Sequence, residues 1–406
     1  MKYLTKEFFL AATVFSKELF GFGAGDSVID LYQIGIAAVG FVLIFRPKPL
    51  FRVVATLAAI IGVSLVLFNL YDYPISSMFV RQAAAVSFIY IGTASYLLSC
   101  SPEQLTIGYV RVCFWAAVIG ILQVALSVAG IDILIRVPMR LDSLAGEPSH
   151  YAVAVAPCVY YCLRYHRTWL SKVRTATILA SLVLTVSATA VAVVSVAFAL
   201  AFYSRRGVIA VMLFVIIGPT LLTIPPEIFP EVIGSRVTSM QQYAETDGDP
   251  WDTTNLTVLS YATNFEVMVS TFTSGRLLGN GFCGHVAAYQ LHFEDTEFTN
   301  HRRYGINAPA AHCLVIRILS EFGMLGAILI ATVIWNSVSN RRSDLWSMFF
   351  TMALVGRAFK LGSWIDYGLP IFVLCAVYFS NPKPASNVSG TIRSDPPKRS
   401  LVALET

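Results

Sequence analysis

The sequence predicts an all-α polytopic membrane protein with about twelve transmembrane helices and one large extracytoplasmic loop. Of the 406 residues, 56% are hydrophobic and only 13% are charged, and the mean hydropathy is +0.67. Near-continuous apolar runs follow one another along most of the chain, and one polar stretch of roughly 88 residues between Thr223 and His312 interrupts them. A soluble core could not bury so much apolar surface, so the composition excludes an ordinary soluble enzyme.

Each apolar run near bilayer-crossing length predicts one helix. The runs cover residues 8–22, 28–45, 53–70, 82–99, 109–128, 149–163, 175–187, 189–204, 207–223, 313–338, 345–360 and 366–380. The pair within 175–204 is short and predicts a shallow hairpin. The chain then divides into residues 1–223 with nine helices, the large loop at 224–311, residues 312–380 with three helices, and a tail at 381–406 whose proline, serine and charge predict disorder.

The basic residues predict the orientation. With a cytoplasmic N-terminus, 17 of the 29 lysines and arginines fall on the cytoplasmic side, as the positive-inside rule requires. Both termini are then cytoplasmic, and the large loop faces outward. These anchors account for the net charge of +5, so the charge predicts no nucleic-acid partner. The seven cysteines show neither a disulfide framework nor metal-ligand spacing.

The large loop is a candidate site because structureless loops of this length are uncommon. All basic residues predicted on the outer side are arginines, namely Arg81, Arg136, Arg140, Arg236, Arg276, Arg302 and Arg303. The guanidinium fork suits phosphate or carboxylate, whereas lysine suffices as a solvated anchor. Chance is the alternative explanation for this bias.

A second candidate is the segment from Gly146 to Ala152, which enters the sixth apolar run. Pro148 predicts a helix start, and the free N–H groups of a helix N-terminus favour an anion. Glu147 is a candidate general base beside Arg140, with Ser149 and His150 as neighbours. An ordinary loop-to-helix entry is the alternative.

The residues from Gly279 to Gly284 spell GxGxxG, but no βαβ unit surrounds them. We therefore reject a dinucleotide site and expect a tight turn in which the backbone approaches a ligand or the membrane face.

Histidine at position 312 stands where the loop re-enters the membrane, and it can exchange a proton near neutral pH. Further along, Glu321 lies four residues after Arg317, which predicts a buried ion pair. Arg357 lies in the eleventh run and is a further site candidate, with an ion pair to Asp366 or snorkelling as the alternative.

The order of these features resembles the bacterial O-antigen polymerase and O-antigen ligase superfamily from about Arg140 to Arg357. The matching pieces are Gly146-Glu147-Pro148-Ser149-His150, Leu184-Thr185-Val186-Ser187, Ser274-Gly275-Arg276 with Gly279 and Gly281, and Ala311-His312-Cys313-Leu314 running into Leu319-Ser320-Glu321-Phe322-Gly323-Met324-Leu325-Gly326. The first piece is more similar to polymerases of the Wzy type.

The resemblance implies an inverting, metal-independent glycosyltransferase in the bacterial inner membrane. It would transfer glycan from undecaprenyl diphosphate to a lipid-linked repeat unit at the periplasmic face, without a cofactor. Implied partners are the lipid-linked oligosaccharide, the bilayer, a chain-length regulator and a flippase. The predicted base is His312 or Glu147, and the predicted substrate-binding residues are Arg140, Arg236, Arg276, Arg302, Arg303, Arg357, Ser149, His150, Gly279 and Gly281.

Two alternatives stay open. An O-antigen ligase would move finished polymer onto the lipid A core. A transporter, such as a lipid-linked oligosaccharide flippase, would show paired charges near the bilayer midplane and inverted repeats.

Overall fold

The computed structural model describes residues 5–15, 21–22, 29–44, 50–131, 140–145, 147–165, 169–202, 238, 256–340 and 345–379. Within these ranges the regular secondary structure is helical apart from two antiparallel two-residue strands, β1 (Gly21–Phe22) and β2 (Ile29–Asp30). The all-α class is therefore confirmed for the described residues.

The α-helices are α1 (Lys6–Ala12), α3 (Leu31–Ile44), α4 (Phe51–Leu70), α5 (Ser77–Leu97), α6 (Pro102–Val128), α7 (Pro148–Tyr165), α8 (Trp169–Leu184), α9 (Ala188–Phe202), α13 (Leu256–Thr273), α14 (His285–Phe293), α15 (Leu314–Asn340), α16 (Leu345–Phe359) and α17 (Leu369–Phe379). Short 3-10 helices are η1 (Thr13–Phe15), η5 (Glu297–Asn300), η6 (Ala308–Ala310) and η7 (Asp366–Gly368). Ten of the twelve apolar runs coincide with these helices. The run at 8–22 is helical only to Phe15 among the described residues, and Gly21–Phe22 form β1. The run at 207–223 and the tail lie outside the described residues.

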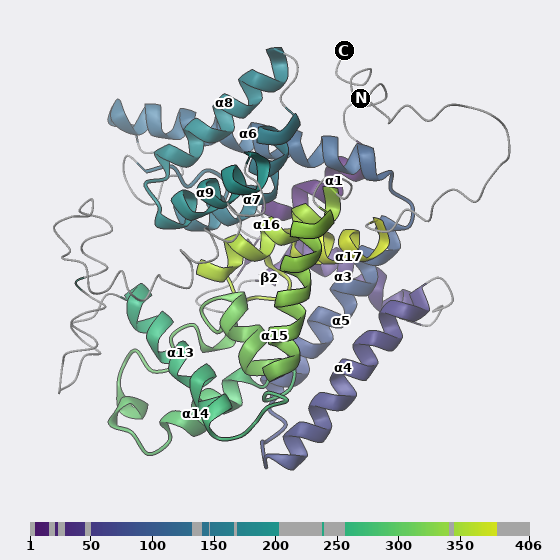
Figure 1. Cartoon of the computed structure of the whole chain (residues 1–406), viewed down its shortest axis with the longest axis vertical. Coiled ribbons are helices and arrows are strands. Elements are labelled where there is room, and N and C mark those ends of the chain that lie inside the picture. The colour runs from purple at the N-terminus through teal and green to yellow at the C-terminus, as the bar shows by residue number, and fades with distance from the viewer. Residues whose placement is uncertain are drawn as a thin grey trace, which may run out of the picture.

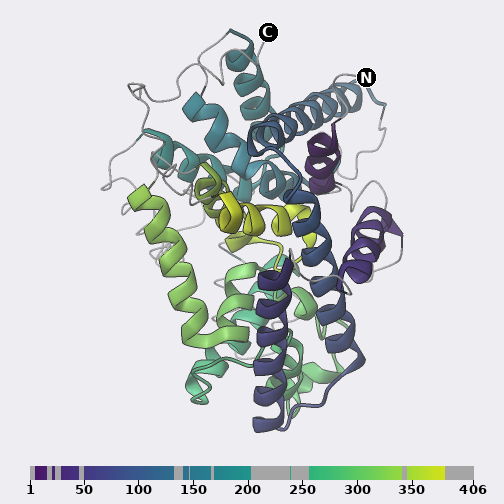
Figure 2. The same cartoon turned by 90° about the vertical axis from the view of Figure 1, so that its right-hand side faces the viewer.

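Among the described residues, three helices are long and apolar enough to cross a membrane, judged by length and composition: α4, α6 and the Leu314–Trp335 part of α15. Only 17% of the apolar window of α4 is buried, so this helix presents most of its hydrophobic surface outward. The helices α4 and α15 run roughly along the long axis, whereas α6 lies across one end (Figures 1 and 2). The axes of α4, α6 and α15 therefore cannot all be parallel to one bilayer normal.

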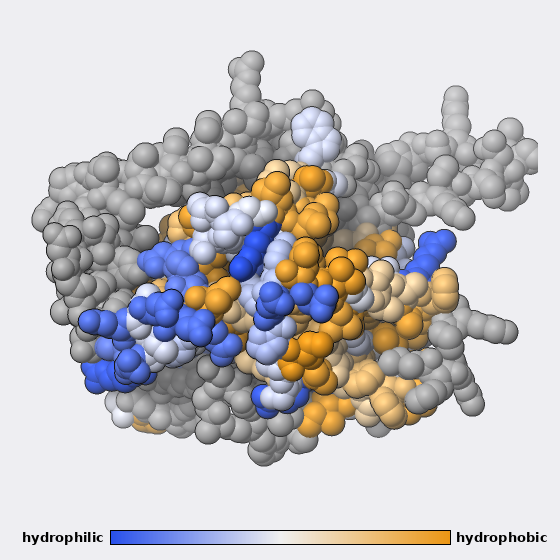
Figure 3. Space-filling model, turned by 90° about the horizontal axis from the view of Figure 1, so that it is seen from below, coloured by the Kyte–Doolittle hydropathy of each residue, from blue (hydrophilic) through white to orange (hydrophobic). Residues whose placement is uncertain are grey.

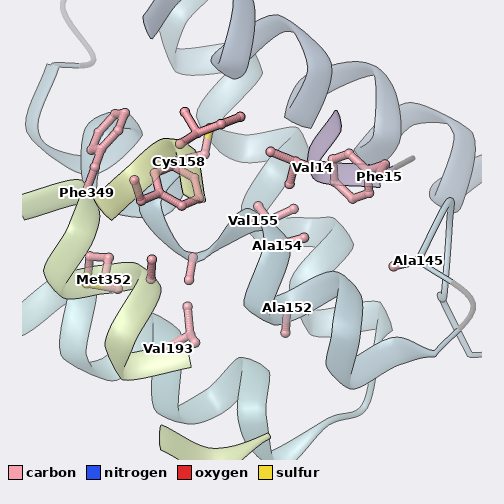
Figure 4. Packing of buried hydrophobic residues seen from close by; sticks show 14 of the residues in the cluster. Val14, Phe15, Ala145, Ala152, Ala154, Val155, Cys158, Val193, Phe349 and Met352 are labelled. Atoms are coloured by element: carbon pink, nitrogen blue, oxygen red, sulfur yellow. The ribbon is translucent and has the colours of Figure 1, made fainter. Parts of the chain in front are cut away.

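The helix at the centre of the hydrophobic core is α7. Its residues from Tyr151 to Ala156 are fully buried, and side chains of α9, α16 and η1 surround it (Figure 4). Small side chains allow this close packing, since a Cβ added to Gly356 of α16 would lie only 3.3 Å from the Val153 Cα. The predicted helix start at Pro148 is confirmed.

The described part of the large loop, which we call the insert, folds at the other end of the molecule (Figure 1). It contains α13, α14, η5 and η6, and α13 packs against α15. Seen from below, hydrophilic residues gather on the side of α13 and α14, and hydrophobic residues on the side of α4 (Figure 3). The insert thus brings polar groups beside apolar helices.

Candidate functional site

A glycine turn at 279–281, inside the insert, packs against α15. The Asn280 N–H donates to the Ser320 carbonyl and the Gly281 N–H to the Glu321 carbonyl, both at 2.9 Å. Gly279 and Gly281 have φ values of +80° and +82°, and a Cβ on Gly279 would lie 2.5 Å from the Glu321 carbonyl. Only glycine tolerates this conformation and this approach together. The predicted tight turn is confirmed, and Gly279 packs on the protein's own backbone; substrate binding by Gly279 and Gly281 stays a prediction.

Beside this turn lies a set of buried polar side chains that we call the insert cluster. Its members are Ser260, Asn264, Asn280, His285, His312 and Ser320. At the centre, His285 Nδ1 lies 2.8 Å from Ser320 Oγ, and His285 Nε2 lies 2.9 Å from Asn264 Oδ1. Buried polar groups are costly unless they are hydrogen-bonded, and these satisfy one another.

The predicted base, His312, lies in the turn that leads into α15. Its φ is +57°, and its side chain is only 5% exposed. Its Nδ1 lies 2.8 Å from Ser260 Oγ, which also accepts a hydrogen bond from Asn307 Nδ2 at 2.9 Å. The Tyr261 ring meets the imidazole edge to face, with the centroids 5.6 Å apart. When Nδ1 donates to Ser260, Nε2 carries the lone pair that a base requires.

The second histidine of the cluster, His285, is held neutral. Burial, followed by the charge of Arg317, lowers its pKa to about 3. A neutral imidazole has one donor and one acceptor nitrogen, so each nitrogen of His285 has a single defined role.

At the edge of the insert cluster, Arg276 is half-buried between two tyrosines. Its guanidinium carbon lies 5.0 Å from the ring centroid of Tyr71 and 5.2 Å from that of Tyr73. It donates to the Tyr73 hydroxyl, and to Asn280 Oδ1 at 3.3 Å. Aromatic faces stabilise a guanidinium and hold it in one orientation, so Arg276 is a fixed cation close to the cluster.

The other arginines of the insert lie in the segment between η5 and η6. Arg302 is exposed and Arg303 is half-buried, and the Arg303 N–H lies 3.2 Å from His301 Nδ1. Arg236 lies outside the described residues.

Two predicted anion-binding arginines make backbone contacts elsewhere. Arg140 donates to the carbonyls of Thr185 and Val186 at 3.2 and 3.0 Å, which stabilises the turn after α8. The fully buried Arg357 donates to the carbonyls of Ala353 and Asp366 at 3.2 and 2.9 Å. These contacts tie both guanidiniums to backbone carbonyls, and substrate binding by Arg140 and Arg357 stays a prediction.

The segment at the start of α7 forms a second polar group, the Glu147 cluster, made of Glu147, Ser149, His150 and Lys360. The carboxylate Oε2 of Glu147 accepts from Lys360 Nζ and from Ser149 Oγ at 3.3 Å, and it lies 3.5 Å from His150 Nε2. Burial raises the pKa of Glu147, but the charges of His150 and Lys360 outweigh it, and the pKa falls to about 2. A carboxylate of such low basicity is a weak general base at neutral pH. The Glu147 carboxylate is also an anion that the protein itself supplies at the N-terminus of α7.

The loop from Lys360 to Trp364 connects the two clusters. A Cβ on Gly362 would lie 1.6 Å from the Ala310 carbonyl, so the loop packs directly on the segment that carries His312. Arg317 holds this loop from α15, because its Nη1 donates to the Gly362 carbonyl at 3.2 Å.

The predicted Arg317–Glu321 ion pair is confirmed. Arg317 Nε lies 2.8 Å from Glu321 Oε1, and Trp364 Nε1 donates to Glu321 Oε2 at 3.0 Å. Because both charged groups are buried and bonded to fixed neighbours, the pair is a structural anchor.

Several members of the site escape sequence reasoning, among them Ser260, Asn264, Asn280 and Lys360. One signal was present: Ser260 and Asn264 stand four residues apart in the apolar α13, which places them on one helical face. Among the described residues, no three histidine, cysteine, aspartate or glutamate side chains lie together as metal ligands.

Comparison with protein-family models gave no match, and comparison with curated proteins gave none.

Proposed function

We propose that the chain is a polysaccharide polymerase of the bacterial inner membrane. It transfers a growing glycan from undecaprenyl diphosphate to a lipid-linked repeat unit at the periplasmic face, with inversion and without a metal or cofactor. The apolar α4, α6 and α15 support a membrane location, and the resemblance described above supports the reaction class.

One observation carries this proposal: the fold joins pieces of the resemblance that are far apart in sequence. Asn280, within the turn that follows Arg276, donates its side-chain amide to Ser320 Oγ at 3.2 Å. Ser320 in turn contacts His285, and His285 contacts Asn264. Asn264 then donates to the backbone carbonyl of Ser260 at 2.6 Å. Through Ser260 this network reaches His312. A cation and a titratable imidazole thus share one buried scaffold, as glycosyl transfer from a diphosphate requires.

In this reaction the hydroxyl oxygen of the acceptor sugar attacks the anomeric carbon of the donor glycan. The bond from that carbon to the diphosphate oxygen breaks, and the lipid diphosphate leaves with both electrons. The hydroxyl proton passes to His312 Nε2, a transfer that contributes about 10²–10⁴-fold. Arg276, with Arg302 and Arg303, counters the charge on the leaving diphosphate.

Glu147 has a different role in this proposal. Its low basicity and its pairing with Lys360 make it a structural anion. Of the two bases that the sequence leaves open, the geometry favours His312.

The test is polymerisation by purified protein in lipid vesicles supplied with a labelled lipid-linked repeat unit. We expect a ladder of lengthened glycans that needs no divalent cation. Arg276→Ala removes the cation and should abolish the ladder, while Arg276→Lys keeps the charge and should retain part of it. His292→Gln is the matched control, because this partly exposed histidine lies in α14 outside the insert cluster.

Two other results would overturn the polymerase. Transfer of a finished polymer to the lipid A core, with no lengthening of the repeat unit, would identify a ligase. Movement of labelled lipid across the vesicle without lengthening would identify a transporter.

A further inference from the structure

The insert cluster contains a hydrogen-bond chain whose direction is fixed by one amide. The Asn264 Nδ2 group lies 2.6 Å from the Ser260 carbonyl and 3.2 Å from the Ile306 carbonyl. Only an NH2 group can donate to two carbonyls, so Oδ1 is the acceptor end of Asn264. His285 Nε2 lies 2.9 Å from this oxygen and therefore must carry a hydrogen.

The other nitrogen of His285 is then an acceptor. A neutral imidazole has one hydrogen, so Nδ1 accepts from Ser320 Oγ at 2.8 Å. Ser320 Oγ accepts in turn from Asn280 Nδ2 at 3.2 Å, and Asn280 Oδ1 accepts from the Tyr73 hydroxyl at 2.9 Å. From Tyr73 to Ser260, every donor in the chain points the same way. Such chains of aligned hydrogen bonds reinforce one another in a dry interior.

Protonation of His285 would break this order. A second ring hydrogen would face the Ser320 hydroxyl hydrogen, and a second cation would be buried near Arg317. Burial, followed by the charge of Arg317, lowers the pKa of His285 to about 3, so His285 stays neutral and the chain keeps one direction at physiological pH.

The chain ends at the backbone carbonyl of Ser260, the residue whose side chain contacts His312. Asn264 ties α13 to the loop at Ile306, and the neighbouring Asn307 donates from Nδ2 to Ser260 Oγ at 2.9 Å. Ser260 Oγ lies 2.8 Å from His312 Nδ1. The Asn264 amide therefore joins the Ser260 backbone to the loop whose Asn307 bonds the Ser260 hydroxyl.

We infer that His285 is a positioning residue: as the neutral Nε2–H tautomer it orients Asn264, and Asn264 holds α13 against the loop at Ile306 and so positions His312 beside Ser260. The catalytic consequence rests on the proposed function, whereas the tautomer of His285 does not. The inference assigns a role to a histidine that touches no substrate.

The first test is ¹⁵N NMR of the histidine-labelled full chain in detergent micelles. His285 is assigned from the signal that disappears in His285→Gln. We expect Nε2 protonated and Nδ1 unprotonated, with no change between pH 8 and pH 5. Titration in this range, or the Nδ1–H tautomer, would overturn the inference without any use of an activity assay.

The second test compares three variants. His285→Phe keeps ring volume and deletes both hydrogen bonds, His285→Gln keeps a donor for Asn264, and His292→Phe is the control on the same helix. We expect shifted His312 ¹⁵N signals in His285→Phe only. The polymerisation rate should fall up to about 100-fold in that variant, the scale of a small misplacement of a reacting group, with KM nearly constant.

Recovery by His285→Gln to within about threefold of the unaltered chain would mark loss of the donor, and not loss of packing, as the cause. An unchanged His312 spectrum in folded His285→Phe would overturn the positioning role. The polymerisation assay could fail with the unaltered chain while the NMR result is as expected. This outcome would overturn the proposed function and leave the tautomer of His285 established.

Discussion

The insert cluster and the Glu147 cluster hold their candidate bases by opposite means. His312 contacts a hydroxyl that is itself oriented by an amide, and both partners are neutral. Glu147 contacts Lys360 and His150, whose charges outweigh burial and lower its pKa to about 2. Neutral partners orient the imidazole without adding a charge beside it, whereas the cations stabilise the carboxylate of Glu147 and lower its basicity. The environment of Glu147, more than its residue type, therefore makes it a weak base.

The largest expected effect separates the two clusters by activity. His312→Gln should lower the polymerisation rate by about 10²–10⁴-fold, because it removes the base but keeps a polar side chain. Glu147→Gln should lower it less than about tenfold, because a carboxylate of such low basicity takes little part in proton transfer. Initial rates with the lipid-linked repeat unit measure both. The reverse order would move the base to the Glu147 cluster.

A second prediction separates the clusters by the pH dependence of stability. The folded pKa of His285 is about 3 against 6.5 for the free group, so the unfolded chain binds an extra proton between these values. Stability from the neutral histidine is complete above pH 6.5 and falls below it, by at most about 1.4 kcal/mol per pH unit. His285→Gln should flatten this slope in unfolding titrations in mixed micelles. A variant curve parallel to that of the unaltered chain would show that His285 is protonated in the fold.

A third prediction concerns the rigidity of the insert cluster. Gly279→Ala should destabilise the fold by more than the roughly 1 kcal/mol that left-handed φ alone costs, because the new Cβ would meet the Glu321 backbone at 2.5 Å. Gly275→Ala is the matched control, since Gly275 has φ of +77° but no atom within 4 Å of the added Cβ. Thermal unfolding of both variants gives the comparison. Equal losses of stability in the two variants would mean that the turn at Gly279 accommodates the new Cβ at no additional cost.

The smallest expected effect is the electrostatic contribution of the Glu147 cluster. The pKa of Glu147 is about 2 in the fold against 4.5 for the free group, so its stabilisation is complete above pH 4.5 and is lost as the pH falls through 2. The Glu147 side chain is 46% exposed, which limits the contribution of its pair with Lys360 to about 1 kcal/mol or less. Lys360→Met should remove this contribution, and added salt should reduce it in the unaltered chain. A loss that salt leaves unchanged would show that the pair is effectively buried.

Much of the fold could be predicted because apolar runs are local. Ten of the twelve runs lie on helices, and the starts at Pro148 and Leu345 agree with the sequence to within one residue. Length and hydropathy set these elements before any tertiary contact. Local sequence did not predict that α6 lies across α4 and α15, because crossing angles depend on how side chains of different helices interlock (Figure 2).

The site was only partly predictable for a similar reason. The sequence located His312, Arg276 and the Arg317–Glu321 pair, since each stands out locally as a polar or charged group within an apolar or glycine-rich segment. It could not show that Arg140 and Arg357 bind backbone carbonyls, or that Glu147 meets a lysine 213 residues away. Those partners come from other helices, and spacing along one helix carries no information about them.

By itself, then, the amino-acid sequence determined an apolar helical chain, the place of its polar insert, and a short set of residues able to bind anions or move protons. The tertiary structure alone decided which of them bind the protein's own groups and which have charged partners. The physical reason is that hydrophobicity and helix formation act over neighbouring residues, whereas the pKa and hydrogen bonding of a buried group depend on the partners that packing brings to it.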